Sequence, residues 1–216
     1  RMITSDWRSY SPDDFLLSFE VNNEARSYMK TEVLHGKLDS YVTDDFYGWL
    51  DDGEGLSYIN NKLDLGIGRF PCTDERTATV YVDKVIAYME NKEVGNWKNK
   101  IYFLADDIND NLHMNDAEEV VKKMEAQHGN DIHLRKVYWD AYKRTSSAIG
   151  FTYPQVTSLL QNYMKQGALM FNYTGHGSPL QISHSKLLTD NDFRTSSSGR
   201  LPLWVLASCE ICPYDS

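Results

Sequence analysis

Three features are scarce in this chain of 216 residues: cysteine, positive charge and long apolar runs. Three cysteines are too few to form a disulfide scaffold, and they leave the redox compartment open. The net charge of −9 argues against nucleic acid as the main partner, because binding to phosphates requires a basic face. No apolar run approaches the ~20 residues that cross a bilayer, so we expect no transmembrane segment in this chain.

The chain also lacks a recognisable signal peptide, a starting methionine, internal repeats and low-complexity segments. It opens on Arg1 and closes on Ser216, shortly after an apolar run. We therefore expect a fragment of a longer protein, with a fold that is incomplete at both ends. Its composition, 41% hydrophobic and 25% charged, is that of a globular domain with a substantial core.

Residue patterns divide the chain at residue 62. Residues 1–62 are polar, aromatic and acidic, which favours irregular loops and a hairpin of the same domain. From residue 63 onward, the apolar residues recur with the periods of strands and helices in alternation. The expected strands are 63–70, 100–105, 133–139, 168–171 and 203–206, and the expected helices are 77–90, 115–127 and 152–166. This alternation predicts an α/β core over residues 63–216, built on a mainly parallel sheet.

The expected helix ends carry their own signals. Asn115 and Glu118 have the spacing of a capping box, in which each side chain satisfies a backbone N–H of the first turn. Gly167 follows the last apolar position of the third helix and is its expected C-terminal stop. The sequence therefore predicts that the second helix begins at Asn115 and that the third ends before Gly167.

The last two expected strands each lead to a chemically reactive residue. His176 follows one of them, between Gly175 and Gly177, and Cys209 follows the other. Chemistry collects at the carboxyl ends of strands in open α/β sheets, so the two residues can form a base–nucleophile pair. An imidazole can take the thiol proton, and the backbone N–H groups of Gly177 and Cys209 are candidates for an oxyanion hole. The pattern predicts a cysteine peptidase.

The same residues admit other interpretations. A Gly-His-Gly segment can be an ordinary turn, and a cysteine at a strand end can be an inert buried thiol. Cys209 and Cys212 form a C-x-x-C that could bind zinc with His176 and His184, or could act as a redox pair. Structural zinc sites usually pair two such motifs, and Pro213 follows where a redox motif would open a helix. These alternatives describe a non-catalytic metal-binding or interaction module.

Two oxygen-rich segments are candidates for calcium. In the first, positions 1, 3, 5, 9 and 12 of a calcium-loop spacing are Asp107, Asn109, Asn111, Asn115 and Glu118. Leu112 stands at position 6, where an EF-hand requires glycine, so the segment is not an EF-hand. The second segment carries Asp44, Asp45, Asp51, Asp52 and Glu54. Each segment could bind structural calcium or could be a solvated acidic loop. In the first segment, the expected ligands are Asp107, Asn109, Asn111 and Glu118.

Several stretches resemble the gingipain family of cysteine peptidases. They are NYTGHGS from Asn172, LPLWVLASC with its Cys 33 positions after the His, DLGIGRFP from Asp64, and ADD with LHM between Ala105 and Met114. With TDDFYG and LDDGEG, these stretches are most similar to PorU-type members, the signal peptidases or sortases of type IX secretion. The resemblance runs from about residue 43 to residue 215. It implies a caspase-like fold, a three-layer α/β sandwich in which the His and the Cys end adjacent strands.

The resemblance also implies roles for single residues. His176 would be the general base and Cys209 the nucleophile. Asp106, at the end of the strand 100–105, matches the acidic residue that orients and charge-stabilises the imidazole, although a loop carboxylate or metal ligand is the alternative. Arginine-specific members carry an acidic residue where this chain reads Leu112-His113-Met114. We therefore expect small uncharged residues at the P1 position of the substrate.

Partners and location follow from the same resemblance. Catalysis through a Cys209 thioester requires no cofactor, while calcium would be a structural ion, as it is in gingipain relatives. The implied substrates are proteins or peptides, above all C-terminal secretion signals, and secretion-system components are the implied partners. The implied location is secreted, periplasmic or at the outer-membrane surface of a Gram-negative bacterium. As an isolated fragment, the chain is expected to be weakly active or inactive.

Overall fold

The computed structural model describes residues 19–21, 41–54, 62–107, 110–147, 150–195, 199–209 and 211. These residues belong to two compact units, one of residues 1–84 and 213–216 and the other of residues 85–212. The second unit contains His176, Cys209 and Asp106, and it is the unit that positions the candidate active site.

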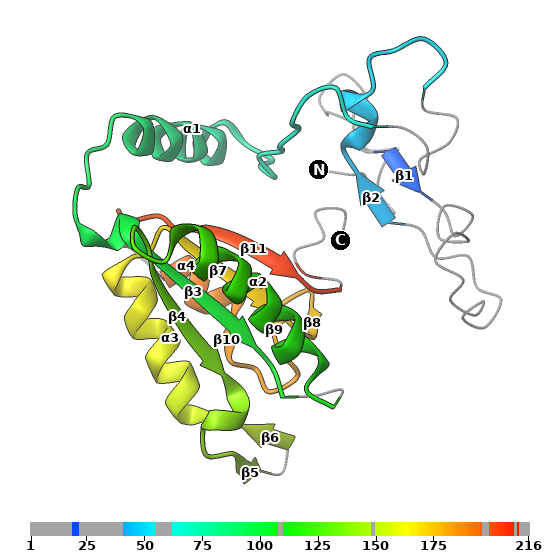
Figure 1. The fold of residues 1–216 in the computed structure, drawn as a ribbon. Coiled ribbons are helices and arrows are strands. Elements are labelled where there is room, and N and C mark those ends of the chain that lie inside the picture. Colours follow the sequence, from blue (N-terminus) through cyan, green and yellow to red (C-terminus); the bar gives the residue numbers. More distant parts are fainter. Residues whose placement is uncertain are drawn as a thin grey trace, which may run out of the picture. The chain divides into compact units, whose positions relative to one another are not determined.

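A four-stranded sheet forms the centre of the second unit (Figure 1). Its strands are β3 (Lys100–Ala105), β4 (His133–Tyr138), β7 (Met170–Thr174) and β11 (Leu203–Ala207), in the spatial order β11-β7-β3-β4. All three pairings are parallel. Parallel neighbours need crossover connections, and here the connections carry helices. The predicted α/β class with a mainly parallel sheet is confirmed.

Helices cover both faces of this sheet (Figure 1). Among the described residues, the α-helices that lie wholly within this unit are α2 (Leu112–His128), α3 (Pro154–Gln166) and α4 (Asp190–Thr195). Successive side chains of a strand point to opposite faces, so Phe103 packs with Val121 of α2 and Leu104 packs with Leu160 of α3. The sheet is therefore the middle layer of a three-layer sandwich.

Shorter elements complete the second unit. The hairpin of β5 (Thr145–Ser147) and β6 (Gly150–Thr152) precedes α3, and η5 (Asn96–Asn99) and η6 (Trp139–Ala141) are single 3₁₀ turns. After β7, the chain forms a small antiparallel sheet of β8 (Gly177–Ser178), β9 (Gln181–Ile182) and β10 (Leu188–Thr189). This small sheet begins at the residue after His176, so it fixes the course of the chain beyond that residue.

In the first unit, β1 (Phe19–Val21) pairs antiparallel with β2 (Tyr41–Thr43), and η4 (Asp45–Gly48) follows. The helix α1 (Glu75–Met89) begins in this unit and ends in the second one. It matches the predicted helix 77–90 to within two residues. Among the described residues, no helix combines the length and the apolar character that crossing a membrane requires.

The predicted strand 63–70 is wrong, because this segment is irregular. Its leucine and isoleucine residues alternate with small or polar ones, which imitates a strand pattern. The backbone N–H of Asp64 instead donates to the carbonyl of Gly48 (2.9 Å), and the Arg69 side chain binds Asp44. The segment is therefore fixed by contacts with η4 and the residue before it.

Other boundaries also differ from the prediction. Helix α2 begins at Leu112, about one turn before Asn115, so Asn115 and Glu118 do not form a capping box. The N–H of Asn115 bonds within the helix to the carbonyl of Asn111 (2.9 Å). Strand β7 starts two residues later than predicted, while Gly167 does cap α3, with φ 82°. The predicted end of α3 is confirmed.

Strand β11 is open on one of its faces. It lies at the edge of the sheet, with β7 as its neighbour. Leu203 is 62% exposed and Val205 is 38% exposed. The apolar run of this strand therefore identified the strand correctly but did not show that one face is open.

Candidate active site

The carboxyl ends of β7 and β11 lie side by side. Thr174 pairs with Ala207 in the parallel register, and His176 and Cys209 each stand two residues beyond this pair. The N–H of Gly175 donates to the carbonyl of Ala207 (3.2 Å), which continues the pairing past the end of β7. Cys209 is exposed and His176 is half-buried. The sheet thus delivers an accessible thiol and an imidazole to the same edge.

The backbone of His176 is held from both sides. Its N–H donates to Oδ2 of Asp106 (2.8 Å). Its carbonyl accepts from the hydroxyl of Tyr173 (2.5 Å) and from the N–H of Ser183 (2.9 Å). Burial raises the pKa of Tyr173, and the nearby charge of Asp106 raises it further, so the phenol stays protonated and remains a donor. These bonds fix the position from which the imidazole projects.

A side chain at either glycine that flanks His176 would force its neighbours to shift. A Cβ atom on Gly177 would lie 2.4 Å from Cγ1 of Ile211 and 2.6 Å from Oγ of Ser208. The turn after β7 therefore contacts the segment after β11, which includes the neighbour of Cys209. Gly177 and Cys209, whose N–H groups are the predicted donors of an oxyanion hole, both lie at this junction. The oxyanion hole itself stays a prediction.

Asp106 lies directly after β3 and is fully buried, at 0% exposure. A buried carboxylate must be bound by donors, since an unpaired charge is costly in the protein interior. Oδ1 accepts from Nδ1 of His113 (2.5 Å), and Oδ2 accepts from the His176 backbone. The structure thus brings Asp106 to the backbone N–H of His176. A role of Asp106 toward the imidazole stays a prediction.

Sequence reasoning did not assign a site role to His113. It lies in the first turn of α2, and its ring stands edge-on to the ring of His176, with centroids 4.9 Å apart. The ring of His184 lies 4.8 Å from that of His176. The sequence did carry a signal for a site role, because only a short loop separates His113 from the end of β3 and from Asp106. What the sequence could not give was the path of that loop.

The zinc alternative needs Cys212, which lies outside the described residues. Among the described residues, Asp51, Glu54 and Asp64 alone form a set of three His, Cys, Asp or Glu side chains whose ligand atoms lie within 4.8 Å of one another. The zinc alternative stays untested.

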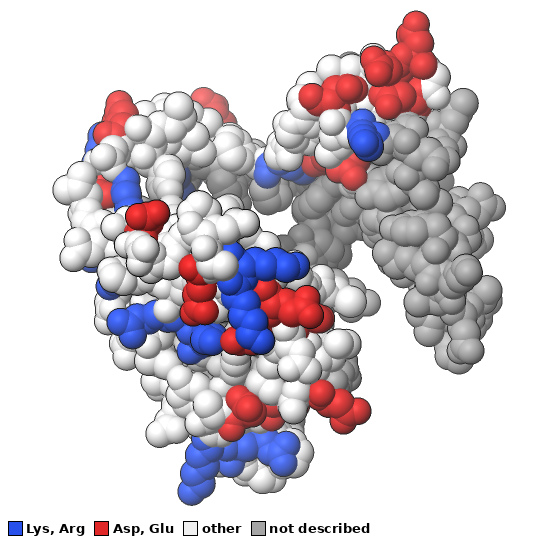
Figure 2. Space-filling view, in the orientation of Figure 1, with Lys and Arg blue, Asp and Glu red and all other residues white. Residues whose placement is uncertain are grey.

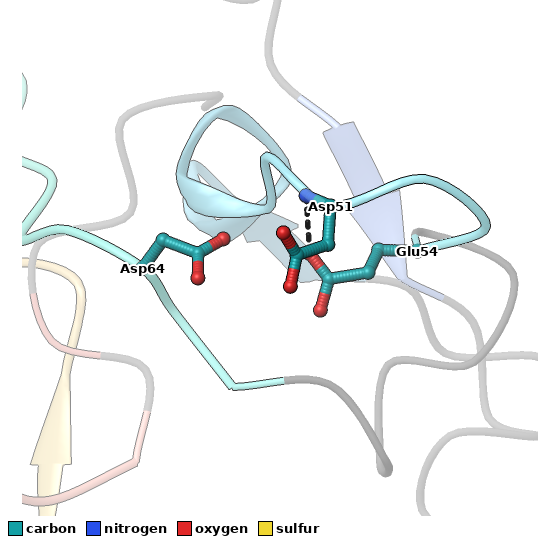
Figure 3. Close-up of side chains that lie close together, drawn as sticks. All are labelled: Asp51, Glu54 and Asp64. Carbon is teal, nitrogen blue, oxygen red and sulfur yellow. Dashed lines mark hydrogen bonds between the residues drawn. The ribbon is translucent and has the colours of Figure 1, made fainter.

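That acidic set belongs to the second oxygen-rich segment of the first unit. Figure 3 shows Asp51 and Glu54 next to each other, with the carboxylate of Asp64 pointing toward them. The N–H of Asp51 donates to Glu54 (3.1 Å), and the N–H of Leu50 donates to Asp64 (2.9 Å). Asp44, from the same predicted segment, binds Arg69 instead (2.6 Å). Asp64 joins this set from a segment that the sequence had assigned to a strand.

The predicted calcium ligands around α2 have other partners in the structure. The hydroxyl of Tyr153 donates to Asp107; burial raises the pKa of Tyr153 to about 12, and Asp107 adds to the shift. Asn109 lies outside the described residues, and Asn111 is the N-cap residue of α2 with φ 66°. Calcium at this segment stays a prediction.

Glu118 is bound on both oxygens by Lys136, each at 3.0 Å, and also by Tyr138 (3.1 Å). The hydrogen bond from Lys136 lowers the pKa of Glu118. A calcium ion bound by Glu118 would therefore have to displace a lysine. Figure 2 shows that acidic and basic side chains lie among one another over the described part of the visible face.

Comparison with known proteins places the chain in a family. A model of peptidase family C25 matches residues 4–216 of the chain. No curated protein matches it. Among solved structures, the Arg specific cysteine proteinase gingipain R is similar, with a TM-score of 0.51 and 18% identity over 78% of this chain. The match covers 36% of that chain, so the present chain spans about a third of its length. The structural likeness shows the shared caspase-like fold.

Proposed function

The chain belongs to peptidase family C25, and from this premise we propose that it carries the catalytic centre of a gingipain-type cysteine endopeptidase. His176 takes the proton of the Cys209 thiol, and the thiolate attacks the scissile carbonyl carbon of a protein substrate. The N–H groups of Gly177 and Cys209 donate to the resulting oxyanion. His176 then returns the proton to the leaving amine, and a thioester on Cys209 remains.

The observation that carries this proposal is the pairing of Thr174 with Ala207. A parallel register fixes the two strand ends at one edge, so neither residue depends on a long loop to reach the other. The bonds to the His176 backbone from Asp106 and Tyr173 support the proposal, because a general base must be held in position to act. Asp106 is the residue that we assign to orient and charge-stabilise this base.

The finer assignment is a PorU-type enzyme, supported by the sequence stretches that this chain shares with that type. Its substrates would be C-terminal secretion signals of proteins, and the thioester would be passed to water or to an amine. The location would be secreted, periplasmic or at the outer-membrane surface of a Gram-negative bacterium, with secretion-system components as partners. The stretch Leu112–Met114 has no carboxylate where arginine-specific relatives carry one, and this absence supports a preference for small uncharged P1 residues.

The test is covalent labelling of the complete natural protein with a peptidyl ketone that alkylates active thiols, followed by mass spectrometry. We expect rapid labelling at Cys209 and slow labelling at the half-buried Cys72. His176→Ala should slow labelling of Cys209 by about 10²–10⁴-fold, the usual contribution of a general base. Labelling of Cys209 at the same rate as Cys72, or without dependence on His176, would contradict the proposal.

A second measurement separates the peptidase from a zinc module. In the peptidase, Cys209→Ala should abolish substrate cleavage and Cys212→Ser should change neither cleavage nor the melting temperature. In a zinc module both changes would lower the melting temperature strongly, because loss of a ligand removes metal-linked folding energy. Equal destabilisation by both changes, with stoichiometric zinc in the purified protein, would overturn the peptidase assignment.

A further inference from the structure

His113 contacts both Asp106 and His176. Its Nδ1 lies 2.5 Å from Oδ1 of Asp106, and its ring stands edge-on to His176 at an interplanar angle of 82°. The side chain is only 15% exposed. A carboxylate is an acceptor, so the Nδ1 atom carries the proton of this hydrogen bond. His113 is therefore a donor to Asp106 from an almost buried position.

The carboxylate of Asp106 is divided between two histidines. Oδ1 is bound by the His113 ring, and Oδ2 is bound by the backbone N–H of His176 (2.8 Å), with the Tyr173 hydroxyl farther away (3.4 Å). Since both oxygens are held, the plane of the carboxylate cannot rotate without breaking one of these bonds. Removing the donor at Oδ1 would free the carboxylate to turn, and the bond to His176 would weaken with it.

The other side of His176 does not depend on His113. The His176 carbonyl is bound by Tyr173 (2.5 Å) and by Ser183 (2.9 Å), which come from β7 and from the loop after β9. The N–H side depends on Asp106, which stands on the loop between β3 and α2. His113 ties that loop to the first turn of α2. The position of His176 along its own turn is therefore set through α2 as well as through the sheet.

We infer that His113 is a positioning residue of the active site. It fixes Asp106 through Nδ1, Asp106 fixes the backbone of His176, and the His113 ring limits the rotation of the His176 ring. This inference rests on the proposed function, in which His176 is the base for Cys209. It adds a second histidine that does not touch the substrate and takes no proton from Cys209.

The test compares His113→Asn with His113→Gln in the complete natural protein. Asparagine places an N–H donor at the position of Nδ1, whereas glutamine places its donor one bond farther out, near Nε2. The measured quantities are the maximal rate of Cys209 alkylation and the concentration of ketone that gives half of that rate. His128→Leu, at the exposed far end of α2, is the matched control on the same helix.

We expect His113→Gln to lower the maximal alkylation rate by about tenfold to a hundredfold, since small displacements of a catalytic group have effects of this size. The half-saturating concentration should stay unchanged, because the reagent does not contact His113. His113→Asn should recover most of the rate, and His128→Leu should match the wild type.

Three results would overturn the inference. The first is a His113→Gln rate equal to that of His128→Leu. The second is an equal loss in His113→Asn and His113→Gln, which would exclude a role for the donor at Nδ1. The third is a loss as complete as in His176→Ala, because His113 would then itself be the base. If His176→Ala is alkylated at Cys209 as fast as the wild type, the proposed function itself is refuted. The failure of the inference and the failure of the proposed function are therefore distinguishable.

Discussion

Gly175 lies so close to Asp106 that a Cβ atom on this glycine would stand 2.7 Å from the carboxylate Oδ2. The same atom would stand 2.4 Å from the hydroxyl of Tyr173. Both groups are held by the His176 backbone and cannot retreat without breaking its hydrogen bonds. The glycine before His176 is thus fixed by packing against the groups that position the base.

We predict that Gly175→Ala lowers the free energy of unfolding by about 1–3 kcal/mol, the usual cost of overpacking. It should also reduce cleavage activity, because the displaced groups are those that bind His176. Denaturant unfolding measures the first effect and substrate turnover the second. Gly68→Ala is the control, because a Cβ there has open space around it, and it should change stability by less than about 0.5 kcal/mol. Equal unfolding free energies for the two variants would contradict the prediction.

Tyr173 should make the protein sensitive to alkaline pH. Burial raises its pKa above the ordinary value of about 10, so above pH 10 the unfolded state loses a proton that the folded state keeps. The stabilisation is complete below about pH 10 and falls as the pH rises toward the folded-state pKa. Thermal melts between pH 8 and pH 11.5 should show this fall, and Tyr173→Phe should make it shallower. The same slope in both proteins would argue against it.

Asp44 and Arg69 should stabilise the first unit. The guanidinium binds both carboxylate oxygens, at 2.6 and 2.7 Å, and the two side chains are 13% and 8% exposed. Arg69→Met leaves a nearly buried carboxylate without this partner, which costs about 3–5 kcal/mol when a buried pair is broken. Lys92→Met is the control, because its pair with Glu90 is exposed and is worth at most about 1 kcal/mol. Unfolding in denaturant, compared between the two variants, decides the prediction.

Calcium is predicted to stabilise the protein through Asp107, Asn109 and Glu118. An ion that binds only the folded state at 100 times its dissociation constant adds about 2.7 kcal/mol, so melts in calcium and in chelator should differ by several degrees. Lys136 competes for Glu118, and Lys136→Met should therefore enlarge the difference. Glu118→Gln should reduce it. If the melting temperature is the same in millimolar calcium and in chelator, for both the wild type and Lys136→Met, calcium at this segment is excluded.

Local residue patterns predicted an element correctly where its own pattern of apolar residues decides how it is buried. Strand β3 was predicted with its observed bounds, because five consecutive apolar residues after Lys100 can be satisfied only inside a covered sheet. Helix α3 was predicted from the helical spacing of its apolar residues, and Gly167 has the conformation that ends it. In the segment 63–70, apolar residues alternate with small or polar ones, which is typical of a strand, yet this segment pairs with no strand among the described residues. An alternating pattern does not reveal whether a partner strand exists.

The sequence by itself determined the fold class and the two reactive positions, since His176 and Cys209 each follow an apolar run that becomes a strand. The family resemblance implied that these strands are neighbours, and tertiary structure alone decided that their ends share a register at Thr174 and Ala207. It also decided that Asp106 binds His113, and that Gly175 and Gly177 are required by contacts with Asp106 and Ser208. The physical reason is the range of the interactions. Periodicity reflects burial of one segment, whereas hydrogen-bond partners and close contacts depend on loops that bring distant residues together.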